Sequence, residues 1–304
     1  MWGPYLADHE RVPEWSKETL KILRGLAEDD DSGVTVREGV EATRIEMDPP
    51  AWIADLEYSE CPPTELPDGF VRGWQYAIPV ADMPVYLKYL EDRLKQAGGR
   101  LEQGVVTSLE TVTPVDASVV NCTGLGAGEL AQDADVVPVR GQLVEVENPG
   151  IKKFFGEYCQ EGAEPTYFLP HGNRVVLGGT HERGRTDIET DAESVAGIIQ
   201  RCVAVEPALQ NAKILNYRVG IRPSRPKVRV ERVRLGSRHV VHNYGHGGSG
   251  FSLSWGCARE VVNLVLDIQQ PPDREGDVLP YPPADTQLGS PSRRMAAWIS
   301  PPKS

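Results

Sequence analysis

The stretch of sequence that decides the fold is His242-Asn243-Tyr244-Gly245-His246-Gly247-Gly248-Ser249-Gly250-Phe251-Ser252-Leu253-Ser254-Trp255-Gly256-Cys257-Ala258. Val240 and Val241 before it predict a strand, and the apolar pattern of Ser252–Leu266 predicts a helix after it. Between them, four glycines within six positions let the backbone approach a ligand closely and direct N–H groups at it. The helix adds partial positive charge at its first turn. The pattern therefore predicts a site for an anion or for the electron-rich edge of a cofactor ring.

Two other interpretations of this stretch are open. His242 and His246 are four residues apart, as zinc ligands often are, although the glycine-rich setting argues against a helix that would hold both. A glycine-rich hairpin that binds no ligand is the third interpretation.

The composition limits the class of protein. The 304 residues include 32 Lys and Arg against 44 Asp and Glu, and the resulting net charge of −12 argues against nucleic acid or an anionic membrane as the main partner. No apolar run approaches the roughly 18 residues of a membrane helix, and the start of the chain has no basic region followed by an apolar stretch. Five scattered cysteines without a C-x-x-C pair predict reduced thiols, no metal site and a cytoplasmic location.

Apolar periodicity predicts a mixture of helices and strands. Helices are expected over Trp15–Ala27, from the N-cap Asp82 to Gly98, over Asp191–Val205 and over Ser252–Leu266. Strands are expected at Val105–Leu109, Val115–Cys122, Gln142–Glu147, Tyr167–Leu169, Arg174–Leu177, Ile214–Val219, Lys227–Leu235 and His239–His242, and residues 34–80 are expected to be rich in strands and loops. Residues 269–304 hold eight of the 25 prolines with charges that cancel, so they are expected to be a disordered tail.

Two further motifs suggest chemistry. In Gly220–Lys227, two X-Pro bonds hold the backbone around Arg222 extended, and an arginine fixed in this way can grip a carboxylate with two hydrogen bonds. Tyr167 could add a phenolic hydrogen bond to the same anion. The plainer alternatives are a surface arginine at a strand end and a half-buried strand tyrosine. In Val119–Gly128 the glycine spacing is G-x-G-x-G, which is a weak match to a dinucleotide fingerprint but suits a strand-to-helix turn beside a cofactor.

Taken together, the motifs of residues 1–268 resemble the D-amino-acid oxidase family. The motifs that carry the resemblance are Trp2-Gly3-Pro4-Tyr5, Asn121-Cys122-Thr123-Gly124, Arg140-Gly141-Gln142, Gly220-Ile221-Arg222-Pro223-Ser224-Arg225-Pro226 and, above all, His242–Ala258. The resemblance implies FAD as cofactor and an α/β (α+β mixed) fold. That fold is a glutathione-reductase-like FAD-binding domain interleaved with an antiparallel-sheet substrate domain. The FAD domain is expected at about 1–35, 82–140 and 236–268, and the substrate sheet at about 36–81 and 141–235.

The resemblance also implies roles for single residues. Arg222 matches the arginine that pairs with the substrate α-carboxylate, Tyr167 the tyrosine that donates to it, and Gly248 the glycine whose carbonyl receives the amino group. Flavin contacts are implied for Gly247, Gly248, Gly250, Phe251 and Ser252, and cofactor contacts on the adenosine side for Val106 and Thr123. The implied reaction is oxidative deamination of a D-amino acid, with hydride transfer from Cα to flavin N5 and reduction of dioxygen to hydrogen peroxide. A homodimer is a possible assembly.

The sequence departs from the family pattern at two places. Animal members carry a second active-site tyrosine four residues before the first, where this chain has Ala163 in the short polar stretch Gln160–Glu164, so a shorter lid is expected. The family's opening strand–G-x-G-x-x-G–helix–strand unit has no counterpart before Trp2, so the first βαβ unit is expected to be missing from this chain. Two alternatives stay open: a D-aspartate or glycine oxidase with the same chemistry, with His171, His181 or Arg183 as basic groups for an acidic substrate, and a flavin-less inactive fragment.

Overall fold

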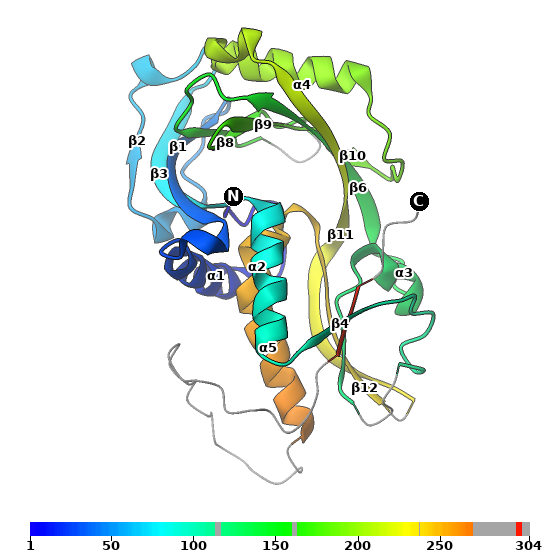
Figure 1. The fold of residues 1–304 in the computed structure, drawn as a ribbon. Coiled ribbons are helices and arrows are strands. Elements are labelled where there is room, and N and C mark those ends of the chain that lie inside the picture. Colours follow the sequence, from blue (N-terminus) through cyan, green and yellow to red (C-terminus); the bar gives the residue numbers. More distant parts are fainter. Residues whose placement is uncertain (113–116, 160–162, 237, 270–295, 300–304) are drawn as a thin grey trace.

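The computed structural model of the chain describes residues 1–112, 117–159, 163–236, 238–269 and 296–299 (Figure 1). Its helices are α1 (Val12–Leu26), α2 (Met83–Gln96), the single turn α3 (Ala127–Leu130), α4 (Ala192–Val205) and α5 (Gly250–Gln269). The four helices predicted from apolar spacing are confirmed, with ends that shift by a few residues. None of the helices within these ranges is long and apolar enough to cross a membrane.

One large mixed sheet forms the body of the molecule. Its strand order is β2-β3-β1-β7-β8-β9-β6-β11-β12-β5, and β10 also pairs with β6. The pairs β1–β7 and β12–β5 are parallel and the others are antiparallel. The strands span β1 (Val34–Thr43), β2 (Tyr58–Glu60), β3 (Arg72–Ala81), β5 (Val119–Asn121), β6 (Val137–Glu147), β7 (Phe154–Glu157), β8 (Tyr167–His171), β9 (Arg174–Gly178), β10 (Glu182–Arg183), β11 (Ile214–Leu235) and β12 (Arg238–His246). This agrees with the expected mixed α/β fold.

The long strand β11 connects the two halves of the sheet. Its first part, up to Ser224, pairs with β6, and its second part, from Arg229, pairs with β12. The prediction of two separate strands here was therefore wrong. The register shifts between Ser224 and Arg229, and this irregularity accommodates Pro226, which cannot donate to a regular ladder.

Two other strand predictions need correction. Residues 105–109 form no strand; the strand in this region is β4 (Arg100–Gln103), since an alternating apolar pattern makes a strand only where a partner edge is available. At the other site, β12 continues to His246, beyond the predicted end at His242 and into the glycine-rich stretch.

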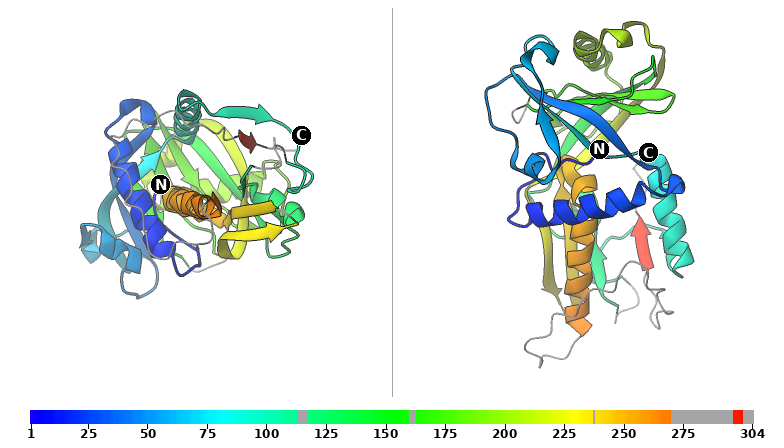
Figure 2. Two further views of the ribbon diagram at one scale, coloured as in Figure 1. Left: turned by 90° about the horizontal axis from the view of Figure 1, so that it is seen from below. Right: turned by 90° about the vertical axis from the view of Figure 1, so that its left-hand side faces the viewer.

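Helices cover both faces of the sheet (Figure 1). On the outer face α4 packs Ile198 and Cys202 against a core that includes Phe155 and Phe168. On the inner, concave face lie α1, α2 and α5, with Trp2, Trp74 and Phe154 in the core. In Figure 2 α1 runs across α5. At this crossing a Cβ added at Gly256 would lie 2.3 Å from the Cα of Trp15, so only glycine permits the close approach of the helices.

Part of the predicted tail and of the lid stretch lies outside the described residues. Of 269–304, residues 296–299 form β13 (Ala296–Ile299), which pairs in parallel with β4. Residues 270–295 and 300–304 are outside the described ranges, as are 160–162 of the predicted lid. The domain boundaries stay a prediction.

Candidate active site

Arg222 lies on the concave face of the sheet, on a seat made by a glycine. A Cβ added at Gly141 would lie 2.1 Å from Arg222 Nη1 and 2.4 Å from Cζ, so the guanidinium rests directly on the Gly141 backbone. Nη1 donates a 3.2 Å hydrogen bond to the carbonyl of Thr180. The guanidinium of a half-buried arginine is thereby held in one place, with donors left over for an anion.

Tyr167 has an equivalent glycine seat on the neighbouring strands. A Cβ added at Gly178, its partner on β9, would lie 2.1 Å from Tyr167 Cζ. The ring therefore lies flat across Gly178 and Gly179. Burial raises the pKa of the phenol, while the charge and hydrogen bond of Arg222 act in the opposite direction. Tyr167 and Arg222 are thus side by side, as the sequence analysis expected of a shared anion site.

The glycine-rich loop meets these side chains at the start of α5. After β12 the chain makes one 3-10 turn over Gly247–Ser249, with φ of +83° at Gly245 and +54° at Gly247. A Cβ added at Gly248 would lie 3.8 Å from Cδ of Arg222. The structure therefore brings Arg222, Tyr167 and Gly248 together.

The side chains that follow in the loop are engaged with the protein. Ser252 Oγ donates to the carbonyl of Gly3 and accepts from the Gly3 N–H, both within 3.0 Å. The ring of Phe251 packs edge to face on Tyr86 at 5.8 Å. Gly250 begins α5 and has no side chain, so a flavin contact at this position would be made by its backbone.

Thr123 lies close to the same centre. Thr123 Oγ1 donates a 2.7 Å hydrogen bond to Asn121 at the end of β5, and the next residue, Gly124, faces the ring of Pro223 on β11. Val106 is in the irregular segment between β4 and β5. Of the predicted adenosine-side pair, Thr123 therefore begins a turn near the site, and the role of Val106 stays a prediction.

The motif Arg140-Gly141-Gln142 acts as a support beneath the site. Arg140 is fully buried and bonds to Glu182, to the Asp187 and Glu189 carbonyls and to Gln142. These bonds hold the segment after Thr180, whose carbonyl accepts from Arg222. Gly141, Gly178 and Thr180 also form the site, and their part in it was not predicted from the sequence. A glycine in a strand, which suggests close approach of a neighbour, was the available signal for the first two.

The histidines of the loop do not form a metal site. His242 and His246 are four residues apart on a strand, which separates them by roughly 13 Å. Nδ1 of His242 bonds the Asn121 amide, and burial lowers the pKa of each imidazole to about 4. No group of three metal-ligating side chains occurs in the described ranges.

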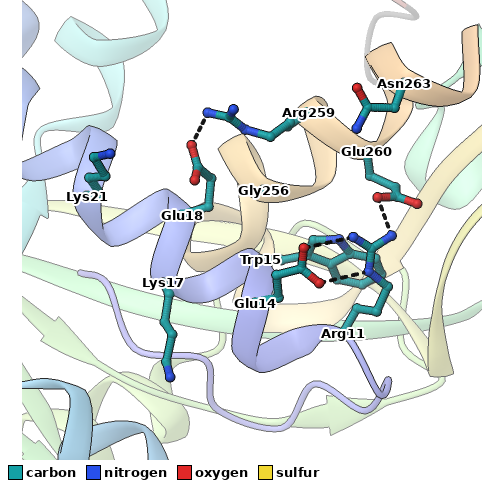
Figure 3. Close-up of a pocket in the computed structure, with 10 residues that line it drawn as sticks. All are labelled: Arg11, Glu14, Trp15, Lys17, Glu18, Lys21, Gly256, Arg259, Glu260 and Asn263. Carbon is teal, nitrogen blue, oxygen red and sulfur yellow. Dashed lines mark hydrogen bonds and ion pairs between the residues drawn. The ribbon is translucent and has the colours of Figure 1, made fainter. Parts of the chain in front are cut away.

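A pocket of about 320 Å³ lies between α1 and α5 (Figure 3). It is lined by Arg11, Glu14, Trp15, Lys17, Glu18, Lys21, Gly256, Arg259, Glu260 and Asn263. Arg11 pairs with Glu14 and Glu260, and Arg259 pairs with Glu18. These opposite charges neutralise one another across the helix crossing, and none of the predicted site residues is among them.

The residues at the glycine loop fit the flavin end of an FAD. β5 and β12 are parallel, and glycine turns follow both: Gly124–Gly126 after β5 and Gly247–Ser249 after β12. The carboxyl ends of parallel strands are where such folds bind cofactors. Near this edge Oδ1 of Asn243 is buried and has no hydrogen-bond partner in the described part of the chain. The 20-residue helix α5 presents its positive end to the same place.

Comparisons with known proteins identify the family. The model of the family DAO, FAD dependent oxidoreductase, matches residues 49–264. The D-amino-acid oxidase of Rubrobacter xylanophilus is 45% identical over 269 residues, which are 87% of this chain and 82% of that protein. The D-aspartate oxidase of Homo sapiens is 36% identical over 269 residues, 84% of this chain and 77% of that one. The glycine oxidase of Geobacillus kaustophilus shares the fold, with a TM-score of 0.68 at 17% identity over 94% of this chain and 85% of that one.

Proposed function

The chain belongs to the DAO family of FAD-dependent oxidoreductases, and on this premise we propose that it oxidises D-amino acids to 2-oxo acids. In balanced form, a D-amino acid, dioxygen and water give a 2-oxo acid, ammonia and hydrogen peroxide. The observation that carries the proposal is the meeting of Arg222, Tyr167 and Gly248 on one face of the sheet. The 45% identity to a protein named D-amino-acid oxidase supports it.

Arg222 and Tyr167 bind the substrate α-carboxylate. The guanidinium offers two parallel N–H donors, and the phenol of Tyr167 offers a third donor beside them. Burial keeps the phenol protonated, since its pKa lies above the ordinary value. The Thr180 carbonyl and the phenol of Tyr167 take up only part of the five N–H donors of Arg222, so the site favours an anion.

The Gly248 carbonyl accepts from the substrate amino group. When Arg222 holds the carboxylate and the Gly248 carbonyl holds the amino group, the hydrogen and the side chain on Cα can be arranged in only two ways. The glycine loop occupies one side, and the site thereby selects which hand of the amino acid presents its Cα–H to the cofactor. No side chain is needed as a general base.

FAD is held, in this proposal, by the backbone of Gly247–Ser252 and by the turn that begins at Thr123. Bound there, it supplies the acceptor for the hydride that leaves Cα. The N-terminal end of α5 stabilises negative charge that develops next to it. Val106 remains the predicted contact on the adenosine side.

D-aspartate is the second candidate substrate. Arg183 on β10 and Arg222 on β11 both lie opposite Val139 of β6, so both are on the concave face. Arg183 is therefore the basic group best placed for a second carboxylate. His171 is not: it is four residues from Tyr167 along β8, roughly 13 Å, and burial lowers its pKa so that it is neutral.

Substrate-dependent peroxide formation tests the proposal. The protein is purified with FAD, bound flavin is confirmed by its visible absorbance, and peroxide and 2-oxo acid are measured with D-alanine, L-alanine, D-aspartate and glycine. We expect the protein to oxidise D-alanine and not L-alanine. The oxidation of D-alanine should be lost in Arg222→Ala and kept in Arg218→Ala. Arg218 is a matched control, because it lies on the same strand and pairs with Glu145.

Each outcome has one meaning. A flavin-loaded protein that oxidises no D-amino acid refutes the proposal. Preferred turnover of D-aspartate, lost in Arg183→Ala, establishes the second candidate. A folded protein that takes up no FAD supports the inactive-fragment alternative.

A further inference from the structure

A buried carboxyl group lies on the same face of the sheet as the proposed carboxylate site. Glu41 of β1 is in register with Gly156 of β7, and Gly156 is in register with Tyr167 of β8. Residues paired in register point to the same face of a sheet. The side chains of Glu41 and Tyr167 therefore stand on the concave face on either side of Gly156, and the side chain of Met1 lies over this glycine.

The carboxyl of Glu41 has little to satisfy it. Its residue is 5% exposed, and the phenol of Tyr76 donates a hydrogen bond to Oε2. The influences on the pKa of Glu41 are burial and the Tyr76 phenol, and no cationic group is among them. A carboxylate buried in this way costs free energy, and burial raises the pKa of Glu41 to about 7. An ammonium group brought next to it would supply the missing counter-charge.

Two tyrosines connect this carboxyl to the glycine loop. Tyr5 and Tyr158 pack edge to face at 5.3 Å, and the charge of Glu41 adds to burial in raising the pKa of both phenols. The backbone carbonyl of Tyr5 accepts from Ser249 Oγ in the loop. Aromatic rings beside a carboxylate are a favourable setting for a cation.

The spacing suits one class of substrate. The strands β1 and β8 are two spacings apart, about 10 Å. From Cα to Nζ the five bonds of an extended lysine side chain span roughly 6 Å, and a hydrogen bond adds about 3 Å. The side chain of Met1 lies over Gly156: a Cβ added at Gly156 would be 3.4 Å from the Cε of Met1. The flexible thioether of Met1 can move to make room for a ligand.

Building on the proposed oxidase function, we propose that Glu41, Tyr5 and Tyr158 form a side-chain subsite that selects D-amino acids with a cationic side chain, of the length of D-lysine. The substrate carboxylate stays on Arg222 and Tyr167, and the distal ammonium binds Glu41. The same carboxyl repels acidic side chains. A subsite at Glu41 therefore contradicts the second candidate, in which Arg183 binds the side chain of D-aspartate.

A comparison of two substrates with the same carbon side chain tests the subsite. D-norleucine has the four-carbon side chain of D-lysine without the terminal ammonium, and the ratio of their kcat/KM values isolates the contribution of that ammonium. Glu41→Gln removes the charge and keeps an acceptor for Tyr76. Glu38→Gln is the matched control, since Glu38 lies on the same strand, faces the other side and is exposed. Thermal denaturation confirms that both variants are folded.

We expect wild type to favour D-lysine over D-norleucine, and Glu41→Gln to lower that ratio by about tenfold or more, the worth of one hydrogen bond to a charged group. Glu38→Gln should leave the ratio unchanged. Substrate-induced changes in the flavin spectrum, measured without dioxygen, should show the same loss for D-lysine binding. An unchanged ratio in Glu41→Gln, or a wild-type preference for D-aspartate, overturns the subsite while D-norleucine turnover still upholds the oxidase. Failure with all of these substrates overturns the oxidase itself.

Discussion

Replacing Gly141 by alanine should damage substrate binding although no side chain of the site is itself replaced. The added Cβ would lie 2.1 Å from Nη1 and 2.3 Å from Nη2 of Arg222. Non-bonded heavy atoms prefer about 3.5–4.0 Å, so the guanidinium has to move by more than about 1 Å. The backbone of Gly141 is not left-handed, and an alanine is compatible with the strand at that position.

The size of the effect follows from that displacement. A shift of roughly 1 Å in a group that orients a substrate costs about a hundredfold in rate, which equals about 2.7 kcal/mol of transition-state stabilisation. Because the carboxylate is gripped before the reaction begins, most of the loss should be in KM. Stability should change by less than about 1 kcal/mol, since a Gly to Ala change at a compatible backbone mainly restricts the unfolded chain.

The assay is steady-state oxidation of D-alanine, with Gly220→Ala as control. Gly220 is the register partner of Gly141 on β11, and nothing lies within 4 Å of a Cβ added there. Gly220→Ala should therefore keep wild-type kinetics. If Gly141→Ala keeps kcat/KM within about twofold of wild type, or if both variants lose activity equally, Arg222 on its glycine seat is not the carboxylate-binding group.

Three further outcomes are expected. Tyr167→Phe should lower kcat/KM for D-alanine by about 10- to 100-fold, since it removes one donor to a charged group; unaltered kinetics would exclude the phenol from substrate binding. Gly256→Ala, whose Cβ would lie 2.3 Å from the Cα of Trp15, should lower stability by about 1–3 kcal/mol or more. Gly25→Ala is the control: open space surrounds Gly25, so this variant should keep or raise the melting temperature. Equal melting temperatures of Gly256→Ala and Gly25→Ala would contradict the close approach of α1 and α5 at Gly256. Burial raises the pKa of Glu41 from 4.5 to about 7, so the protonated form stabilises the native state below the unfolded pKa, and this contribution is lost as pH rises through 7. Between about pH 5 and pH 8, the free energy of urea unfolding of the wild type should fall by up to about 3 kcal/mol relative to that of Glu41→Gln. Parallel pH profiles of the two proteins would refute the raised pKa of Glu41.

Local patterns were sufficient for much of the fold. The helices α1, α2, α4 and α5 have apolar residues at helical spacing, and local spacing is what determines which face of a helix is buried. The strand–glycine–helix unit at His242–Ala258 was likewise visible, because glycine-rich turns depend on residues close in sequence. Strand pairing was less predictable. The single strand β11 and the absence of a strand at 105–109 depend on which partner edges are present.

The sequence by itself determined the composition of the site: an arginine between prolines, a strand tyrosine and a glycine loop before a helix. Only the tertiary structure decided that these groups meet on one face, that Gly141 and Gly178 are the seats on which Arg222 and Tyr167 rest, and that Glu41 shares that face through Gly156. The physical reason is that residue types and short periodicities are local properties. The register of strands from distant parts of the chain is instead set by the packing of the whole sheet.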